Sequence, residues 1–105
     1  MPYRVIFLQE ADQDVSEAIA WYRDIGEGLE QGFKSDLSTV IPILQENPYV
    51  YQEVFEGIRI GLTKRLKFRV IYEIEDRNVL ILAVMHPKRH ERRWKQRIPT
   101  QRGRR

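Results

Sequence analysis

Hydrophobic residues in the first half of the chain recur at helical spacing after one short extended segment. Residues 3–8 are rich in β-branched and aromatic side chains and predict a strand. Two helical stripes follow, separated by the helix-breaking Gly26-Glu27-Gly28. The first stripe is Ala11, Val15, Ala18, Ile19, Tyr22 and Ile25, and the second is Leu29, Phe33, Leu37, Val40, Ile41 and Leu44. So short a break predicts an antiparallel helical hairpin.

Proline interrupts the second stripe. Pro42 lacks a backbone donor, and its ring clashes with the preceding turn, so we expect a kink or an early end of the helix there. Asn47-Pro48 then closes the helical region.

The second half alternates with the period of a strand. Ile58, Ile60 and Leu62 form one alternating set, and Leu66, Phe68, Val70, Tyr72 and Ile74 form another. Residues 75–78 make a polar turn. Residues 79–85 are apolar on both faces, which is typical of a central strand. These three runs predict an antiparallel meander.

The order of elements predicts an α+β fold with four parts. These are an N-terminal strand, an antiparallel helical hairpin, a three-stranded antiparallel meander, and a short basic C-terminal helix (residues 88–97) or tail. A chain of 105 residues suits one domain. We expect that domain to span residues 1–98 and to be followed by a basic, disordered tail over residues 99–105.

Composition narrows the class of protein. The chain has no cysteine, which excludes disulfides and thiolate metal sites and fits a reducing cytoplasm. Its start lacks a signal-peptide pattern. The longest apolar run, residues 79–85, is far shorter than the ~20 residues that span a bilayer. We therefore expect a cytoplasmic protein without a membrane segment.

Charge is distributed unevenly. Residues 87–105 carry nine of the eighteen lysines and arginines and only one of the fifteen acids, Glu91. Residues 1–86 carry the remaining nine bases and fourteen acids. An acidic body with a basic end indicates that the end meets an anionic partner, or that it is a solubilising tail.

Several spaced motifs, taken with the order of elements, resemble the RelE/ParE superfamily of toxins from about Tyr3 to Arg97. The motifs are Asn47-Pro48, Gly57-Ile58-Arg59, Phe68-Arg69-Val70-Ile71-Tyr72, and residues 81–86 ending in His86, followed by Arg89 and Trp94. The combination is more similar to the ParE branch than to the RelE branch.

This resemblance implies a toxin of a type II toxin–antitoxin system of the plasmid-stabilisation type, with a cognate antitoxin as partner. ParE-type toxins are associated with inhibition of DNA gyrase, whereas RelE-type toxins cleave messenger RNA on the ribosome. Because the two branches share a fold, the site must decide between them. A third alternative is a non-toxic family member that only binds partners.

Cleavage of RNA without a metal needs an acid, a base and cations that stabilise the phosphorane. The catalytic candidates, if the chain is RelE-like, are Arg59, Arg65, Arg69 and His86. By their odd numbers within the strands, Arg59, Lys67 and Arg69 are expected to share the face opposite the apolar one. No tyrosine follows Tyr72, which departs from the RelE pattern, and Tyr72 itself is expected in the core.

A second set of residues suits binding of a target protein or nucleic acid. It comprises Lys64, Lys67, Arg89, Arg92, Arg93 and Trp94. Arginines interleaved with an aromatic suit stacking on bases or a protein hot spot, although such clusters are also found on solvated surfaces, and Trp94 is expected to pack back on the sheet. We expect Trp21 to take part in core or helix packing. No metal-ligand cluster or nucleotide-binding loop is present in the sequence, so no cofactor, metal or small-molecule ligand is expected.

Overall fold

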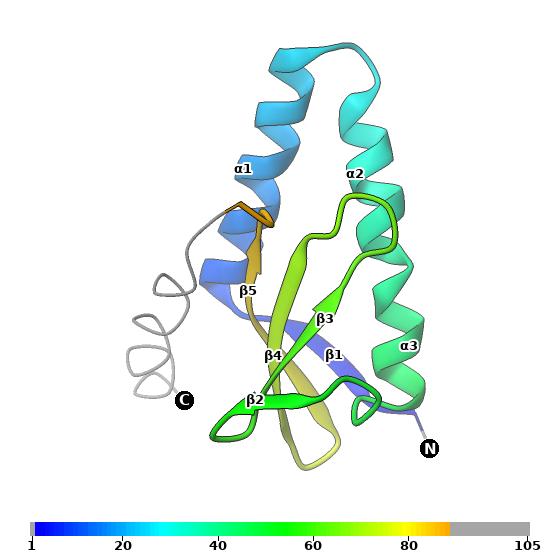
Figure 1. Ribbon diagram of the computed structural model, residues 1–105, viewed down its shortest axis with the longest axis vertical. Helices are drawn as coiled ribbons and strands as arrows, with labels where there is room; N and C mark the ends of the chain where they lie inside the picture. The colour runs from blue at the N-terminus through cyan, green and yellow to red at the C-terminus, as the bar shows by residue number, and fades with distance from the viewer. Residues whose placement is uncertain (1, 89–105) are drawn as a thin grey trace.

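The computed structural model describes residues 2–88 of the chain. Two helical arms stand beside a twisted sheet and form one layer against it (Figure 1). None of the helices between residues 2 and 88 has the length and apolar character needed to cross a membrane. The predicted helix over residues 88–97, which contains Arg89, Arg92, Arg93 and Trp94, lies outside the described residues apart from Lys88, as does the predicted tail over residues 99–105.

The helical hairpin forms where its two stripes predicted it. Helix α1 spans Gln9–Ile25, and α2 spans Leu29–Ser38. The chain reverses at Gly28, whose φ of 85° lies in the left-handed region that a residue without a Cβ adopts at little cost. The apolar faces of the two arms can therefore meet above the same sheet.

The second helical stripe is split into two helices. Helix α3 spans Val40–Glu46, and the break lies at Thr39, three residues before Pro42. Pro42 falls in the first turn of α3, where a backbone N–H has no partner within the helix and its loss costs little. The expected interruption is thus confirmed, but the proline begins a new helix instead of ending the old one.

The sheet has five strands in the order β1-β5-β4-β3-β2. The strands are β1 (Arg4–Phe7), β2 (Glu53–Phe55), β3 (Ile58–Leu62), β4 (Arg69–Glu75) and β5 (Asn78–Met85). Strand β5 is central, as predicted, and pairs in parallel with β1 and antiparallel with β4. The predicted meander is confirmed as β3-β4-β5, but β2 was not predicted, because three exposed residues give no alternation.

The main core lies between the helices and one face of the sheet, hereafter the helix face. Its buried residues are Ala11, Phe33, Leu37, Val40, Leu44, Phe68, Val70, Tyr72, Val79, Ile81 and Val84. The burial of Tyr72 was expected from its parity with Phe68 and Val70. The opposite face, hereafter the second face, carries Ile58, Ile71, Leu82, Ala83 and Met85.

The prediction that Arg59 shares a face with Arg69 is wrong. Strand β3 pairs with β4 so that Arg59 lies opposite Tyr72 and Ile58 lies opposite Glu73. Even positions of β3 therefore share a face with odd positions of β4. Arg59 joins the helix face, whereas Arg69, opposite Leu62 and Met85, is on the second face.

Candidate functional site: the basic end of the sheet

Three segments that carry cations meet at one end of the sheet. Leu62, Arg69 and Met85 are paired across β3, β4 and β5, so the turn after β3 and the residues after β5 both extend beyond this row. We call this region the basic end, and it consists of Lys64, Arg65, Lys67, Arg69, His86 and Lys88. Lys64, Arg65, Lys67 and Lys88 are exposed. The basic end therefore presents four exposed cations on two neighbouring segments.

A buried carboxylate from α2 holds the turn of the basic end in place. Asp36, which is 2% exposed, accepts hydrogen bonds from the backbone N–H groups of Arg65 (2.9 Å) and Leu66 (2.8 Å). Burial raises the pKa of Asp36, but these N–H groups and the Thr63 hydroxyl lower it by more, so the net pKa lies below its ordinary value. The carboxylate is thus charged and already satisfied by the turn, and the turn can direct its cations outward.

Sequence reasoning overlooked Asp36, although a signal was available. Its position falls on the second apolar stripe, three residues after Phe33 and four before Val40. An acid on the buried side of a helix needs partners, because an unsatisfied buried charge is costly. Here the partners come from a turn 29 and 30 residues further along the chain, a distance that no local pattern reports.

The same turn is fixed from inside by Thr63. Its hydroxyl oxygen accepts a hydrogen bond from the Phe68 N–H at 2.9 Å, and its own N–H donates to the Phe68 carbonyl at 3.1 Å. Lys67 has a φ of 60°, an unusual conformation for a residue with a side chain. The turn is therefore a specified structure and presents its cations from a fixed backbone.

His86 lies at the rim of the main core. Its ring meets the edges of Phe68 (centroids 5.3 Å apart) and Trp21 (6.3 Å), and its Nδ1 accepts a hydrogen bond from the Lys88 N–H at 3.1 Å. Of the two roles expected for Trp21, core or helix packing, a core position is wrong because the residue is 54% exposed, and its ring lies against Tyr22 and His86. His86 belongs to the basic end, but it packs toward the helix face and so away from Arg69.

Arg59 is bound to the loop between α3 and β2. Its guanidinium donates hydrogen bonds to the carbonyl oxygens of Tyr51 (2.5 Å) and Tyr49 (3.4 Å). It also lies 5.1 Å from the centroid of the Tyr49 ring and 3.9 Å from a carboxylate oxygen of Glu53. One guanidinium nitrogen, Nη1, thus donates to two carbonyls while the group lies beside an aromatic ring and a carboxylate, so Arg59 has a structural role here.

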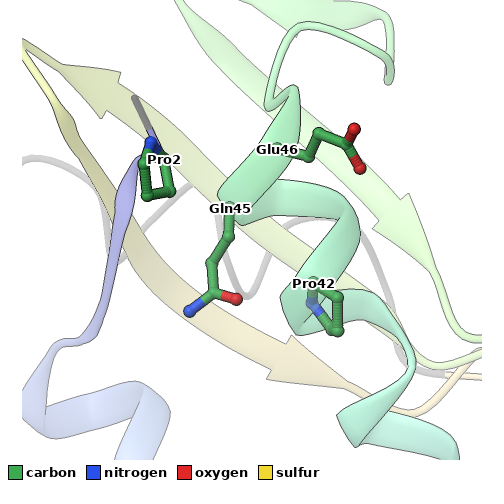
Figure 2. Close-up of a pocket in the computed structure, with 4 residues that line it drawn as sticks. All are labelled: Pro2, Pro42, Gln45 and Glu46. Atoms are coloured by element: carbon green, nitrogen blue, oxygen red, sulfur yellow. The ribbon is translucent and has the colours of Figure 1, made fainter.

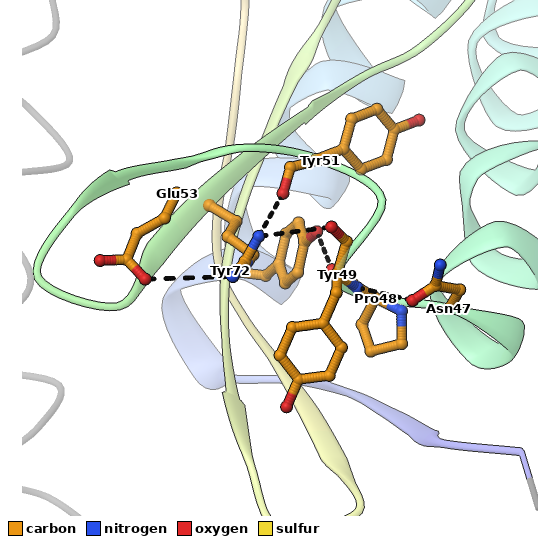
Figure 3. Close-up of polar contacts among 7 residues, drawn as sticks. Asn47, Pro48, Tyr49, Tyr51, Glu53 and Tyr72 are labelled. Carbon is orange, nitrogen blue, oxygen red and sulfur yellow. Dashed lines mark hydrogen bonds and ion pairs between the residues drawn. The ribbon is translucent and has the colours of Figure 1, made fainter.

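Tyr72 secures the same loop from the core. Its hydroxyl donates a hydrogen bond to the Pro48 carbonyl, and its ring is fully buried (Figure 3). Burial raises the pKa of the Tyr72 phenol to about 12. The residue opposite Arg59 in the sheet is thus a second anchor of residues 47–53.

The four predicted catalytic residues are not brought together. Arg65, Arg69 and His86 are at the basic end, but Arg69 and His86 belong to opposite faces of the sheet. Arg59 is three residues before the end of β3, about 10 Å along the strand, and on the helix face. Of the predicted binding residues, Lys64 and Lys67 lie together on the exposed turn.

One pocket lies elsewhere. It has a volume of about 330 Å³ and is lined by Pro2, Pro42, Gln45 and Glu46, on α3 and the start of the chain (Figure 2). Among the described residues that line it, the charged one is an acid, Glu46. Among residues 2–88, no group of histidines and acids is arranged to hold a metal ion.

The chain matches a model of a known protein family. The model described as the ParE toxin of the type II toxin–antitoxin system parDE matches residues 5–91. This range contains helices α1, α2 and α3, the basic end, and the whole sheet except Arg4, the first residue of β1. A comparison with curated proteins gives no match.

Solved structures share the fold. A chain of the chromosomal ParDE toxin–antitoxin system from P. aeruginosa matches with a TM-score of 0.64 and 19% identity over 80% of this chain and 95% of that one. The toxin–antitoxin complex RelBE2 from Mycobacterium tuberculosis matches with a TM-score of 0.60 and 22% identity, over 82% and 99%. A free double mutant of the E. coli toxin RelE matches with a TM-score of 0.61 and 13% identity, over 95% and 98%. All three have the RelE/ParE-like fold, which this chain therefore shares.

Proposed function

Because the chain belongs to the family of ParE toxins of type II toxin–antitoxin systems, we propose that it stops growth by binding DNA gyrase. In this proposal the basic end is a binding surface and not a catalytic centre. The observation that carries it is the separation of the four catalytic candidates, with Arg59 bound to the loop of residues 47–53 and Arg69 and His86 directed to opposite faces. Acid, base and cations must surround one phosphate for RNA cleavage, and this arrangement does not provide that.

The exposed cations of the basic end support recognition of an acidic protein surface. Lys64, Arg65 and Lys67 are held by a backbone that Asp36 and Thr63 fix, so little ordering is needed on binding. Complementary charge also accelerates the encounter of two proteins. Gyrase is a cytoplasmic target, so the proposal implies that the toxin acts in the cytoplasm.

The proposal includes a cognate antitoxin and a role in plasmid stabilisation. The M. tuberculosis neighbour is a toxin–antitoxin complex, and the P. aeruginosa neighbour is part of a ParDE system. An acidic, amphipathic segment of an antitoxin would complement the basic end. Co-expression with the protein encoded beside this chain is expected to restore growth and to give a stable complex.

Induced expression of the chain alone tests the target. We expect incorporation of labelled thymidine to fall before incorporation of labelled amino acids, and purified protein to inhibit DNA supercoiling by gyrase. Early loss of protein synthesis with intact supercoiling would instead show a ribosome-directed ribonuclease and overturn the proposal. Normal growth would show a non-toxic family member that only binds partners.

A further inference from the structure

The outer side of α1 carries exposed apolar side chains near the C-terminal end of the helix. Trp21 and Ile25 are 54% and 53% exposed, and they lie one helical turn apart on the same side of α1. Single exposed apolar residues are ordinary on a protein surface, whereas adjacent ones mark sites of contact with other molecules. Helix α1 continues past the end of β5, so this pair stands beside the basic end (Figure 1).

The ring of Trp21 is held in position by two aromatic neighbours. It meets Tyr22 edge-on at a centroid distance of 4.9 Å, and it meets His86 edge-on at 6.3 Å. A side chain whose orientation is already set loses little conformational entropy when a complex forms. Tryptophan is also among the residues that contribute most to the stability of protein interfaces. Trp21 therefore has the exposure, the fixed orientation and the residue type of an interface anchor.

Charges of opposite sign lie on the two sides of this anchor. Glu17 is four residues before Trp21 and Asp24 is three residues after it, so both acids lie on the same side of α1 as the tryptophan, and both are exposed. Lys88, which is also exposed, approaches from the sheet instead. Its N–H donates a hydrogen bond to Nδ1 of His86, the residue whose ring meets Trp21. The order across the surface is thus acid, apolar centre, base.

We call this surface the α1 patch, and it consists of Glu17, Trp21, Asp24, Ile25 and Lys88. Its order of charges is self-complementary. In a dimer with two-fold symmetry the same patch of both copies meets, so an acid must face a base and the apolar centre must face itself. A two-fold axis near Trp21 satisfies both conditions, because it brings the acids of each copy to Lys88 of the other.

The other exposed apolar segment does not have this property. Residues 49–56, around β2, expose Tyr49, Val50, Val54 and Phe55. Both charged residues in this segment, Glu53 and Glu56, are acids. Two copies that met through this segment would bring acidic segments together, at an electrostatic cost. Charge complementarity therefore selects the α1 patch as the surface that fits a second copy.

The size of the α1 patch predicts a weak dimer. From Glu17 to Ile25 the helix rises about 12 Å, which is short for one side of a permanent interface. Small interfaces are typical of transient complexes. We therefore expect association that depends on protein concentration.

We propose that two copies of this chain associate through their α1 patches about a two-fold axis. Trp21 and Ile25 of one copy pack against the same residues of the other, and Glu17 and Asp24 of each copy pair with Lys88 of the other. The dimer uses one cation of the basic end and leaves Lys64, Arg65 and Lys67 exposed. The proposal does not depend on gyrase as the target.

Sedimentation velocity of the purified full chain tests this proposal. We expect the average mass to rise with concentration from that of one chain toward that of two, and not beyond, because a two-fold contact closes on itself. Trp21→Ser is expected to raise the dissociation constant about tenfold or more, since it removes the anchor from both copies. Val54→Ser removes an apolar side chain that is equally exposed (52%) on β2, and this control is expected to associate like the native protein.

An exchange of charges tests the pairing of the acids with Lys88. Glu17→Lys is expected to weaken association, and Lys88→Glu in the same chain is expected to restore it, because each copy then presents the reversed pair. Asp12→Lys makes the same change of charge on α1 and is the control. Asp12 is exposed and nine residues before Trp21, which places it on the opposite side of the helix, so association is expected to be unchanged.

Three results would overturn the proposal. One is a single-chain mass for the folded native protein at every concentration. Another is a dimer that Trp21→Ser and Glu17→Lys leave intact or that Val54→Ser dissociates, since either would place the interface elsewhere. The third is a mass that grows beyond two chains, which would show a head-to-tail contact.

Discussion

The carboxylate of Asp36 accepts a hydrogen bond of 2.8 Å from the backbone N–H of Leu66, and a second, of 2.9 Å, from the adjacent Arg65. A helix residue thereby fixes a turn that is 30 residues away in sequence and carries the exposed cations of the basic end. The geometry of this surface is consequently determined in the core, by a buried residue.

Asp36→Asn is expected to lower the free energy of unfolding by about 2 kcal/mol, because hydrogen bonds to a charged group are replaced by weaker or mismatched ones. Denaturation in urea measures the loss. Asp24→Asn, an exposed acid on α1, is the matched control and is expected to change stability by less than about 0.5 kcal/mol. Equal stability of the two variants would contradict the role given to Asp36.

The hydrogen bonds from the turn to Asp36 also predict that stability depends on pH. Since the pKa of Asp36 is lower in the folded protein than its ordinary value, the stabilisation is fully present above that ordinary value, about 3.9, and is lost as the pH falls through the folded pKa. The difference in stability between the native protein and Asp36→Asn is therefore expected to be constant near neutral pH and to shrink in acid. A difference that grew on acidification would show that the pKa is raised instead.

The local spacing of hydrophobic residues was sufficient to predict most of the fold. The stripes through Phe33 and Tyr22 and the apolar run of β5 located the helices and the central strand, because each pattern reports a buried face directly. The register of β3 against β4 was not predictable in this way. It depends on how many residues lie between the two strands, and residues 63–68 separate Leu62 from its partner Arg69.

The site was less predictable than the fold because it also depends on the register of β3 against β4. Parity alone placed Arg59 beside Arg69, whereas the actual register brings Arg59 to Tyr72 and the loop of residues 47–53. Lys67 was expected on the strand with Arg69, whereas the structure places it before β4, on the exposed turn that also carries Lys64. Residues whose role depends on long-range pairing require the structure.

Arg59→Lys separates a structural from a catalytic role. A lysine keeps the charge but has a single nitrogen and no planar group, so it cannot bond to the Tyr51 carbonyl, lie beside the Tyr49 ring and approach Glu53 as the guanidinium does. We expect the free energy of unfolding to fall by about 1 kcal/mol. Toxicity per folded molecule is expected to remain. Arg23→Lys, in an exposed ion pair with Glu30, is the control and should have little effect on stability. A fully stable but inactive Arg59→Lys protein would favour direct chemistry by this residue.

Tyr72 predicts a loss of stability in alkali. Burial raises its pKa to about 12 in the folded protein, whereas an exposed tyrosine has a pKa of about 10. The contribution of Tyr72 to stability is thus complete below pH 10 and is lost as the pH rises toward 12. Burial also raises the pKa of Tyr22 and Tyr51, so phenolate absorbance is expected to show fewer tyrosines titrating near pH 10 in native protein than in unfolded protein. Tyr72→Phe should reduce this alkaline loss, and Tyr49→Phe, on an exposed ring, should leave it unchanged.

Neutralising the turn of the basic end tests its role in binding. In a triple variant, Lys64→Gln, Arg65→Gln and Lys67→Gln remove three exposed cations while the backbone bonds to Asp36 and Thr63 remain. Each exposed charge pair contributes about 0.5 kcal/mol, so the loss of all three cations is expected to weaken binding roughly tenfold. The concentration that half-inhibits gyrase supercoiling measures this change. Added salt should weaken gyrase inhibition by the native protein, and it should weaken inhibition by the triple variant less. The control Lys34→Gln changes an exposed cation on α2 and is expected to inhibit normally. Undiminished inhibition by a folded triple variant would move the target-binding surface away from the basic end.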